Sequence, residues 1–183
     1  MIASHNHSDD DSEANGYELY LMRHGPAGQR GSLGTHLDDG LRVLTDTGRK
    51  KMLRVARGLR KLPAKLDWVV TSPLARAKET AEIVARVAAP EAPLSECEAL
   101  APGGSSEALL SFLAEHSERT RVLLVGHEPD LGLLAGHLMG AGSKAKLGFR
   151  KGGCCLIRLQ ELPPRSAGEL VWWATPRLLR KLA

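Results

Sequence analysis

The sequence predicts a three-layer α/β/α sandwich with a mostly parallel central sheet. Short apolar runs alternate along the chain with longer segments whose apolar residues recur at helical spacing. Three of these runs end abruptly in loops that carry Arg or His, which is where open α/β sheets place functional residues. The length of 183 residues, 43% of them hydrophobic and 25% charged, fits one domain with a substantial core.

The first half of the chain contains two predicted strands, each followed by a predicted helix. The strands are short, mostly apolar runs, and the helices show apolar residues at helical spacing or a high alanine content. Pro63 ends the first helix, and Ser72-Pro73 separates the second strand from the second helix. In chain order, the predicted elements are Tyr17–Met22, Arg49–Leu62, Leu66–Thr71 and Ala75–Ala89.

The second half continues this alternation and then adds two strands. The segment Ala92–Leu100 has an ambiguous pattern and is left unassigned. Beyond it, the predicted elements are a helix at Glu107–His116, a strand at Arg121–Val125, a helix ending at Met139, and strands at Cys154–Leu159 and Glu169–Ala174. We expect the last two strands to be antiparallel neighbours joined through Pro163-Pro164.

Two regions of different composition define the domain organisation. Residues 1–16 are polar and acidic, so we expect a disordered N-terminal tail followed by one domain over residues 17–183. The sequence has no apolar run of about 20 residues and no apolar signal-peptide core, so we expect no membrane association and a cytoplasmic location. The adjacent Cys154 and Cys155 and the isolated Cys97 match neither a disulfide framework nor a zinc motif.

The charge of the chain is compatible with an anionic substrate. The formal net charge is +4 and the pI is about 9.1. Aromatic residues make up only 4% of the chain, and no basic stretch is interleaved with them. Because a stacking platform for single strands is missing, we expect no nucleic-acid partner.

The three strand-ending loops supply Arg23-His24, Arg76 and His127. In a parallel sheet the carboxyl ends of the strands share one edge, so these side chains are expected to converge. Arg76 lies in the first turn of its predicted helix, where the helix dipole disfavours a cation unless an anion compensates it. The combination predicts an anion site.

Three motifs in these loops resemble a known family. The segment Leu21–Pro26 matches the RHG signature of the histidine phosphatase (phosphoglycerate-mutase-like) superfamily. Ser72–Ala81 resembles the second signature of that superfamily, and Val125–Pro129 resembles the third. The resemblance runs from Tyr17 to the C-terminus in the family order, and it implies the phosphoglycerate mutase-like fold.

Within that superfamily, the chain is most similar to the small bacterial phosphohistidine phosphatases of the SixA type. Arg42–Gly48 resembles their RPLT-x-x-G segment, with Val43 in place of the usual proline, and the resemblance adds Arg42 to the substrate-binding residues. The ending Trp172–Leu179 also resembles theirs. No long insertion is available to build the lid expected of a glycolytic mutase.

The chemistry expected of these residues is phosphoryl transfer through a covalent intermediate. A neutral imidazole is a competent nucleophile toward phosphorus, and we assign this role to His24. Arg23 and Arg76 supply charge and bidentate hydrogen bonds to the phosphoryl oxygens, and a protonated His127 would add a third cationic donor. A backbone carbonyl near Gly25 is expected to hold the other imidazole nitrogen of His24.

The proton donor is left open between two carboxyl groups. The superfamily commonly places an acidic residue a few positions before a glycine after the second signature, and Glu98 is the preferred candidate there. Asp39, just before the Arg42 segment, is the alternative. A phosphoramidate leaving group needs less help from an acid, because its nitrogen can already be protonated near neutral pH.

The sequence thus predicts a monomeric, metal-independent phosphohydrolase without a cofactor, acting on phosphohistidine in proteins. The chain lacks a Cys-x5-Arg loop, an Asp-x-Asp after an apolar strand, and a Walker motif. Two alternatives remain. One is a broad phosphomonoesterase acting on small phosphate esters such as nucleotides, sugar phosphates or polyphosphate, and the other is a phosphate-binding module without turnover.

Two loops are expected to surround the site and to leave it shallow and open. They are Gln29–Leu41 and Pro102–Ser106, both short and rich in Gly or Ser. A basic rim for an acidic protein partner is a further hypothesis, with a solvated basic loop as its alternative. The rim residues are Lys144, Lys146, Arg150 and Lys151.

Overall fold

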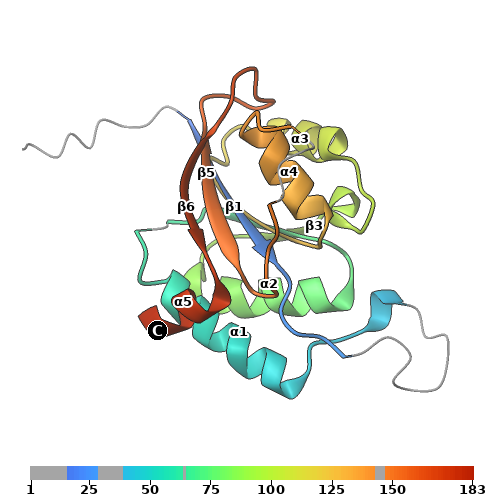
Figure 1. The fold of residues 1–183 in the computed structure, drawn as a ribbon, viewed down its shortest axis with the longest axis vertical. Coiled ribbons are helices and arrows are strands. Elements are labelled where there is room, and N and C mark those ends of the chain that lie inside the picture. The colour runs from blue at the N-terminus through green and yellow to red at the C-terminus, as the bar shows by residue number, and fades with distance from the viewer. Residues whose placement is uncertain (1–15, 29–38, 64, 143–146) are drawn as a thin grey trace, which may run out of the picture.

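The structure is a computed structural model that describes residues 16–28, 39–63, 65–142 and 147–183 (Figure 1). Nearly all of the predicted tail and most of the loop Gln29–Leu41 lie outside these residues. The helices and strands are β1 Tyr17–Arg23, η1 Asp39–Leu41, α1 Asp46–Leu59, β2 Trp68–Thr71, α2 Ala75–Ala88, β3 Leu94–Glu96, η2 Glu98–Leu100, α3 Ser106–Ala114, β4 Arg121–Gly126, α4 Asp130–Leu138, β5 Cys154–Leu159, β6 Glu169–Ala174 and α5 Pro176–Leu182.

One six-stranded sheet organises the molecule, in the order β3-β2-β4-β1-β5-β6. The pairs β3–β2, β2–β4 and β4–β1 are parallel, whereas β5 runs antiparallel to β1 and β6 antiparallel to β5. The mostly parallel sheet and the antiparallel β5–β6 pair are confirmed. Parallel neighbours require crossover connections, and helices supply them.

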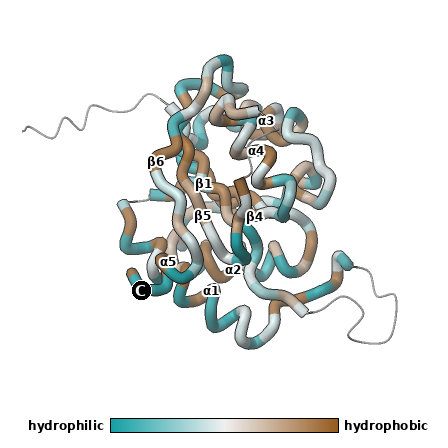
Figure 2. The backbone as a smooth tube through the Cα atoms, in the orientation of Figure 1, coloured by the Kyte–Doolittle hydropathy of each residue, from teal (hydrophilic) through white to brown (hydrophobic). Residues whose placement is uncertain are grey.

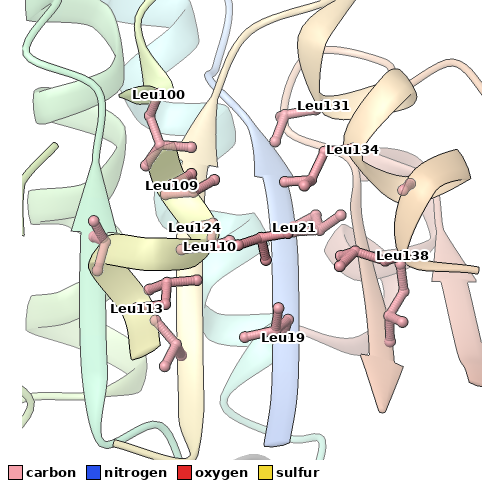
Figure 3. Packing of buried hydrophobic residues seen from close by; sticks show 14 of the residues in the cluster. Leu19, Leu21, Leu100, Leu109, Leu110, Leu113, Leu124, Leu131, Leu134 and Leu138 are labelled. Atoms are coloured by element: carbon pink, nitrogen blue, oxygen red, sulfur yellow. The ribbon is translucent and has the colours of Figure 1, made fainter. Parts of the chain in front are cut away.

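Helices cover both faces of the sheet, so the predicted three-layer arrangement is confirmed (Figure 1). Successive residues of each strand point to opposite faces: Leu19 and Leu21 of β1 pack under α3 and α4, whereas Tyr20 and Met22 pack under α1, α2 and α5. Figure 3 shows leucines of α3 and α4 meeting those of β1 and β4 in the first of these cores. In Figure 2 the central strands are mostly hydrophobic.

Local sequence signals explain where the helices begin. The hydroxyl groups of Thr45, Ser105 and Thr175 each accept a hydrogen bond from a backbone N–H in the first turn of α1, α3 and α5. The strands and the four predicted helices are found within a few residues of their expected bounds. Among the described residues, no helix is both long enough and apolar enough to cross a membrane.

Two parts of the chain were not assigned from the sequence. The ambiguous segment Ala92–Leu100 contains the short edge strand β3 and the 3-10 turn η2. The helix α5 was missed, although Thr175 followed by Pro176 is a typical helix start. Leu179 of α5 is fully buried against α1, so this short helix completes the core on that face of the sheet.

The close approach of α1 and α5 depends on Gly58, and this gives a stability prediction. A Cβ atom at this position would overlap the backbone carbonyl of Leu179, which cannot rotate away. We expect Gly58→Ala to lower the free energy of unfolding by about 1–3 kcal/mol, measured by urea denaturation. Gly148→Ala is the control, because a Cβ there meets nothing within 4 Å, and an equal loss in both variants would contradict this account.

Candidate active site

Three loops meet at the carboxyl edge of the parallel strands. Arg23 at the end of β1 lies beside Gly126 at the end of β4, and Thr71 at the end of β2 lies beside Val125. Hydrogen bonds continue the sheet beyond these ends: the backbone N–H of His24 donates to Gly126 O at 3.1 Å and that of Ser72 to Val125 O at 2.9 Å. The loops that follow the three strands therefore begin in fixed positions.

A cavity of about 250 Å³ lies at this edge. Its lining contains three Arg, two His, one Lys, two carboxylate residues and one Pro. The lining residues are Arg23, His24, Asp39, Arg42, Arg76, Pro102, His127, Glu128 and Lys151. Five of the predicted site residues, and Asp39, are thus brought together from segments far apart in the sequence. Glu98 is not among them.

His24 is held in one tautomer by its own loop. Its Nδ1 lies 2.7 Å from the carbonyl oxygen of Gly25, and because a carbonyl only accepts, Nδ1 carries the hydrogen. The expectation of a backbone carbonyl near Gly25 is confirmed. Burial lowers the pKa of His24 to about 3, so the ring is neutral at pH 7 and Nε2 has a free lone pair. This arrangement suits a nucleophile.

Thr80 of α2 fixes the loop after β1, and the sequence analysis did not single it out. Its buried hydroxyl accepts a hydrogen bond from the Gly25 N–H at 3.0 Å and donates to the carbonyl of Arg76 at 2.7 Å. One side chain therefore links the peptide that follows His24 to the helix turn that carries Arg76. The position of Thr80 in the second motif, four residues after Arg76, was the available signal.

The Arg23 guanidinium is anchored to the segment before β5. Its Nη1 donates to the carbonyl of Phe149 at 2.7 Å, while the Phe149 N–H donates to a carboxylate oxygen of Glu128 at 2.5 Å. Phe149 is buried and stacks near Trp173, with ring centroids 4.1 Å apart. The next turn is held as well, because the N–H of Gly152 donates to the carbonyls of Arg23 and His24.

Arg76 and Arg42 share one carboxylate. Arg76 donates to the Asp39 carboxylate at 2.9 Å and to its backbone carbonyl at 2.7 Å, and Arg42 Nε contacts the other carboxylate oxygen at 2.8 Å. The Arg76 side chain is only 4% exposed. A cation in the first turn of α2 therefore has the compensating anion that the helix dipole requires, and Asp39 supplies it. Asp39, the alternative proton donor of the sequence analysis, is thus bound by two guanidinium groups.

His127 lies next to His24, with ring centroids 5.1 Å apart. Its Nε2 is 2.8 Å from the hydroxyl oxygen of Ser72. Burial, followed by the positive charge of Arg76, lowers the pKa of His127 to about 4. The condition under which His127 would be a third cationic donor is therefore not met at pH 7: the residue is neutral, because a charged imidazole is costly in a buried site that already holds arginines.

Two buried nitrogen atoms at the cavity have no hydrogen-bond partner among the described residues. They are Nε of Arg23 and Nδ1 of His127. Buried polar groups are nearly always hydrogen-bonded, and the exceptions need an explanation. An oxyanion in the cavity would accept from both nitrogens, so the arrangement fits the anion site predicted from the sequence.

The glutamate that lines the cavity is not the one expected as the proton donor. Glu98 is an exposed residue at the start of η2 and does not line the cavity. Glu128 does line it, and desolvation raises the pKa of its carboxyl group, which favours the protonated form needed to donate a proton. Its place directly after His127 in the third motif was the signal that sequence reasoning passed over. In the described part of the chain, no three His, Cys, Asp or Glu side chains are placed to hold a metal.

Sequence comparison identifies relatives of this chain. The profile of the Histidine phosphatase superfamily (branch 1) matches residues 19–101, a range that contains the first and second motifs. An uncharacterized protein of Picosynechococcus sp. (strain ATCC 27264 / PCC 7002 / PR-6) is 38% identical over 167 residues. This alignment covers 88% of the chain and 98% of the relative.

Solved structures share the fold. The protein histidine phosphatase SixA complexed with tungstate matches with a TM-score of 0.74 and 23% identity, covering 87% of this chain and 97% of SixA. A candidate α-ribazole-5'-P phosphatase from Escherichia coli matches at 0.66 and 20%, covering 87% and 97%. Phosphoglycerate mutase from Bacillus anthracis str. Sterne matches at 0.67 and 15%, covering 92% and 97%. At these identities the likeness concerns the fold, which is phosphoglycerate mutase-like as expected.

The lowered pKa values of the two histidines predict acid-sensitive stability. Between pH 7 and 5 the unfolded chain protonates its histidines near their ordinary pKa of 6.5, while folded His24 and His127, with pKa values of about 3 and 4, stay neutral. The unfolded state then binds more protons, so stability falls as the pH falls. We expect His24→Asn to reduce this loss by about 2 kcal/mol, measured by urea unfolding at both pH values. An unchanged pH dependence would contradict the neutral, buried His24.

Proposed function

Because this chain belongs to the histidine phosphatase superfamily, we propose that it hydrolyses phosphohistidine in proteins through a phosphohistidine intermediate on its own His24. The observation that carries the proposal is the convergence of His24, Arg23, Arg76 and His127 on one cavity. The orphaned nitrogens of Arg23 and His127 support it, since a phosphoryl group has oxygens to accept from both.

In the first step, His24 Nε2 attacks the phosphorus atom and the bond from phosphorus to the leaving nitrogen breaks. The Gly25 carbonyl keeps the hydrogen on Nδ1 and stabilises the positive charge that develops on the ring. Arg23 and Arg76 stabilise the charge on the transferring oxygens without reorganising, because Phe149 and Asp39 already fix their orientation. The leaving imidazole departs neutral when its other nitrogen has been protonated, so little acid catalysis is required.

In the second step, water attacks the phosphorus of the intermediate, and the bond to His24 Nε2 breaks. The electron pair of that bond returns to Nε2, so His24 becomes neutral again with its hydrogen on Nδ1, and inorganic phosphate leaves with the oxygen and the protons of the water. Dividing one displacement into two lowers the barrier of each. We propose that the reaction needs no metal, since fixed cations of the chain provide the charge stabilisation that Mg²⁺ supplies in other phosphoryl-transfer enzymes.

The choice of phosphohistidine protein as substrate rests on the SixA-like features. The chain shares the fold of SixA, a protein histidine phosphatase that was solved with the oxyanion tungstate, and it carries the Arg42–Gly48 segment. The second candidate is a small phosphate ester, favoured by the fold shared with the α-ribazole-5'-P phosphatase candidate and by a cavity large enough for more than a phosphoryl group.

The covalent role of His24 gives a direct prediction. We expect His24→Ala to abolish turnover of an aryl phosphate while the chain stays folded, because no other residue takes over the nucleophile. The wild-type chain should acquire acid-labile, base-stable phosphate from labelled substrate, and the variant should not. Turnover of the wild type should be the same after treatment with a chelator. Labelling of a serine, or metal-dependent turnover, would overturn the mechanism.

The identity of the substrate is tested at the basic rim. Lys144 and Lys146 lie outside the described residues, but Arg150 is exposed beside Lys151 and does not line the cavity. We expect Arg150→Glu to lower kcat/KM for a phosphohistidine protein about threefold or more and to leave a small aryl phosphate unchanged. Arg60→Glu, at the end of α1, is the charge-matched control. Equal losses on both substrates would favour the small-ester phosphatase.

A further inference from the structure

We propose that Ser72 is a positioning residue that fixes the tautomer of His127, so that a neutral His127 donates its Nδ1–H to the phosphoryl group. The proposal rests on the proposed function, because it assigns a task to a residue behind the same site. It concerns the direction of one hydrogen bond between two buried side chains.

The geometry leaves Ser72 and His127 little freedom. Ser72 is fully buried, and His127 is 3% exposed. The backbone of Ser72 is held on both sides: its N–H donates to Val125 O at 2.9 Å, and its carbonyl accepts from the Thr71 hydroxyl at 3.1 Å. The Ser72 hydroxyl oxygen then lies 2.8 Å from His127 Nε2.

The direction of this bond follows from what else the Ser72 hydroxyl contacts. Its oxygen accepts a hydrogen bond from the Leu74 N–H at 3.3 Å, and a hydroxyl has one hydrogen to donate. Among the described residues, the hydroxyl oxygen has one further hydrogen-bond partner, His127 Nε2, which can accept that hydrogen. If Nε2 carried a hydrogen instead, the buried hydroxyl hydrogen would have no acceptor, which is costly. Ser72 therefore donates, and Nε2 accepts.

A neutral ring that accepts at Nε2 must carry its hydrogen at Nδ1. Burial is the largest cause of the lowered pKa of His127, the positive charges of Arg76, Arg23 and Arg42 lower this pKa further, and the carboxylate of Asp39 opposes them. The neutral His24 ring lies alongside, and Asp130 lines a small neighbouring pocket with His127. The buried Nδ1 has no partner among the described residues.

His127 can therefore donate a hydrogen bond to the phosphoryl group without adding a positive charge to the site. The other tautomer would present a lone pair at Nδ1, which repels phosphoryl oxygens. With Ser72 donating, Nδ1 already carries its hydrogen before substrate arrives, so no proton has to move during binding. Arg23 and Arg76 supply the positive charge that stabilises the phosphoryl group, while His127 orients this group through one neutral hydrogen bond.

The first test is a measurement on the wild-type protein by ¹⁵N-detected NMR of the histidine rings at pH 7. We expect His127 as the Nδ1–H tautomer, with its Nδ1–H resonance shifting when inorganic phosphate is added. The Nε2–H tautomer or a doubly protonated ring would overturn the proposal. This measurement does not depend on turnover, so it tests the role of Ser72 even if the chain does not hydrolyse phosphohistidine.

The second test separates positioning from packing. We expect Ser72→Ala to populate both tautomers of His127 and to lower kcat for an aryl phosphate about tenfold, with partial recovery in Ser72→Thr, which restores a hydroxyl. Tyr20→Phe is the control, because it removes a hydroxyl of another buried residue, one that bonds to Glu18 and to neither Ser72 nor His127. Wild-type tautomer and kcat in Ser72→Ala, or the same loss in Tyr20→Phe, would overturn the proposal.

Discussion

The parallel pairing of β1, β4 and β2 is the constraint on which the rest of the structure depends. It brings three strand ends into one row, and the backbone hydrogen bonds from His24 to Gly126 and from Ser72 to Val125 extend that row into the loops. Buried residues on both faces of these strands fix the register, because a shift by one residue would turn every apolar side chain to the wrong face. The packing of the hydrophobic cores on the two faces of the sheet thus determines where the site residues lie.

Burial then decides the charge state of the site. Placing two histidines among arginines in a desolvated cavity keeps both rings neutral, while the arginines remain charged and are held by Asp39 and by the carbonyl of Phe149. The two histidines are oriented by different neighbours. A carbonyl holds Nδ1 of His24 and leaves Nε2 as a lone pair, whereas a hydroxyl contacts Nε2 of His127. In the mechanism that we propose, the neighbouring group, and not the residue type, makes His24 the nucleophile and His127 a hydrogen-bond donor.

Sequence reasoning succeeded where a local pattern has one physical solution. Apolar runs such as Arg121–Val125 can be buried only as strands of a covered sheet, and the motif residues follow them directly. It failed where a role depends on contacts across the fold. Glu98 matched a spacing but is exposed, and Glu128 was overlooked although it lines the cavity. The short helix α5 was missed because its burial against α1 is a tertiary contact.

The sequence by itself determined the fold class and the family and singled out His24, Arg23, Arg76 and His127, which the structure gathers at one cavity, because strand periodicity and motif order are local properties of the chain. Only the tertiary structure decided that Asp39 is the counter-ion of Arg76, that Thr80 ties Gly25 to α2, and that His127 is neutral beside Ser72. These facts depend on distance and desolvation between residues far apart in the chain, and no local pattern encodes either quantity.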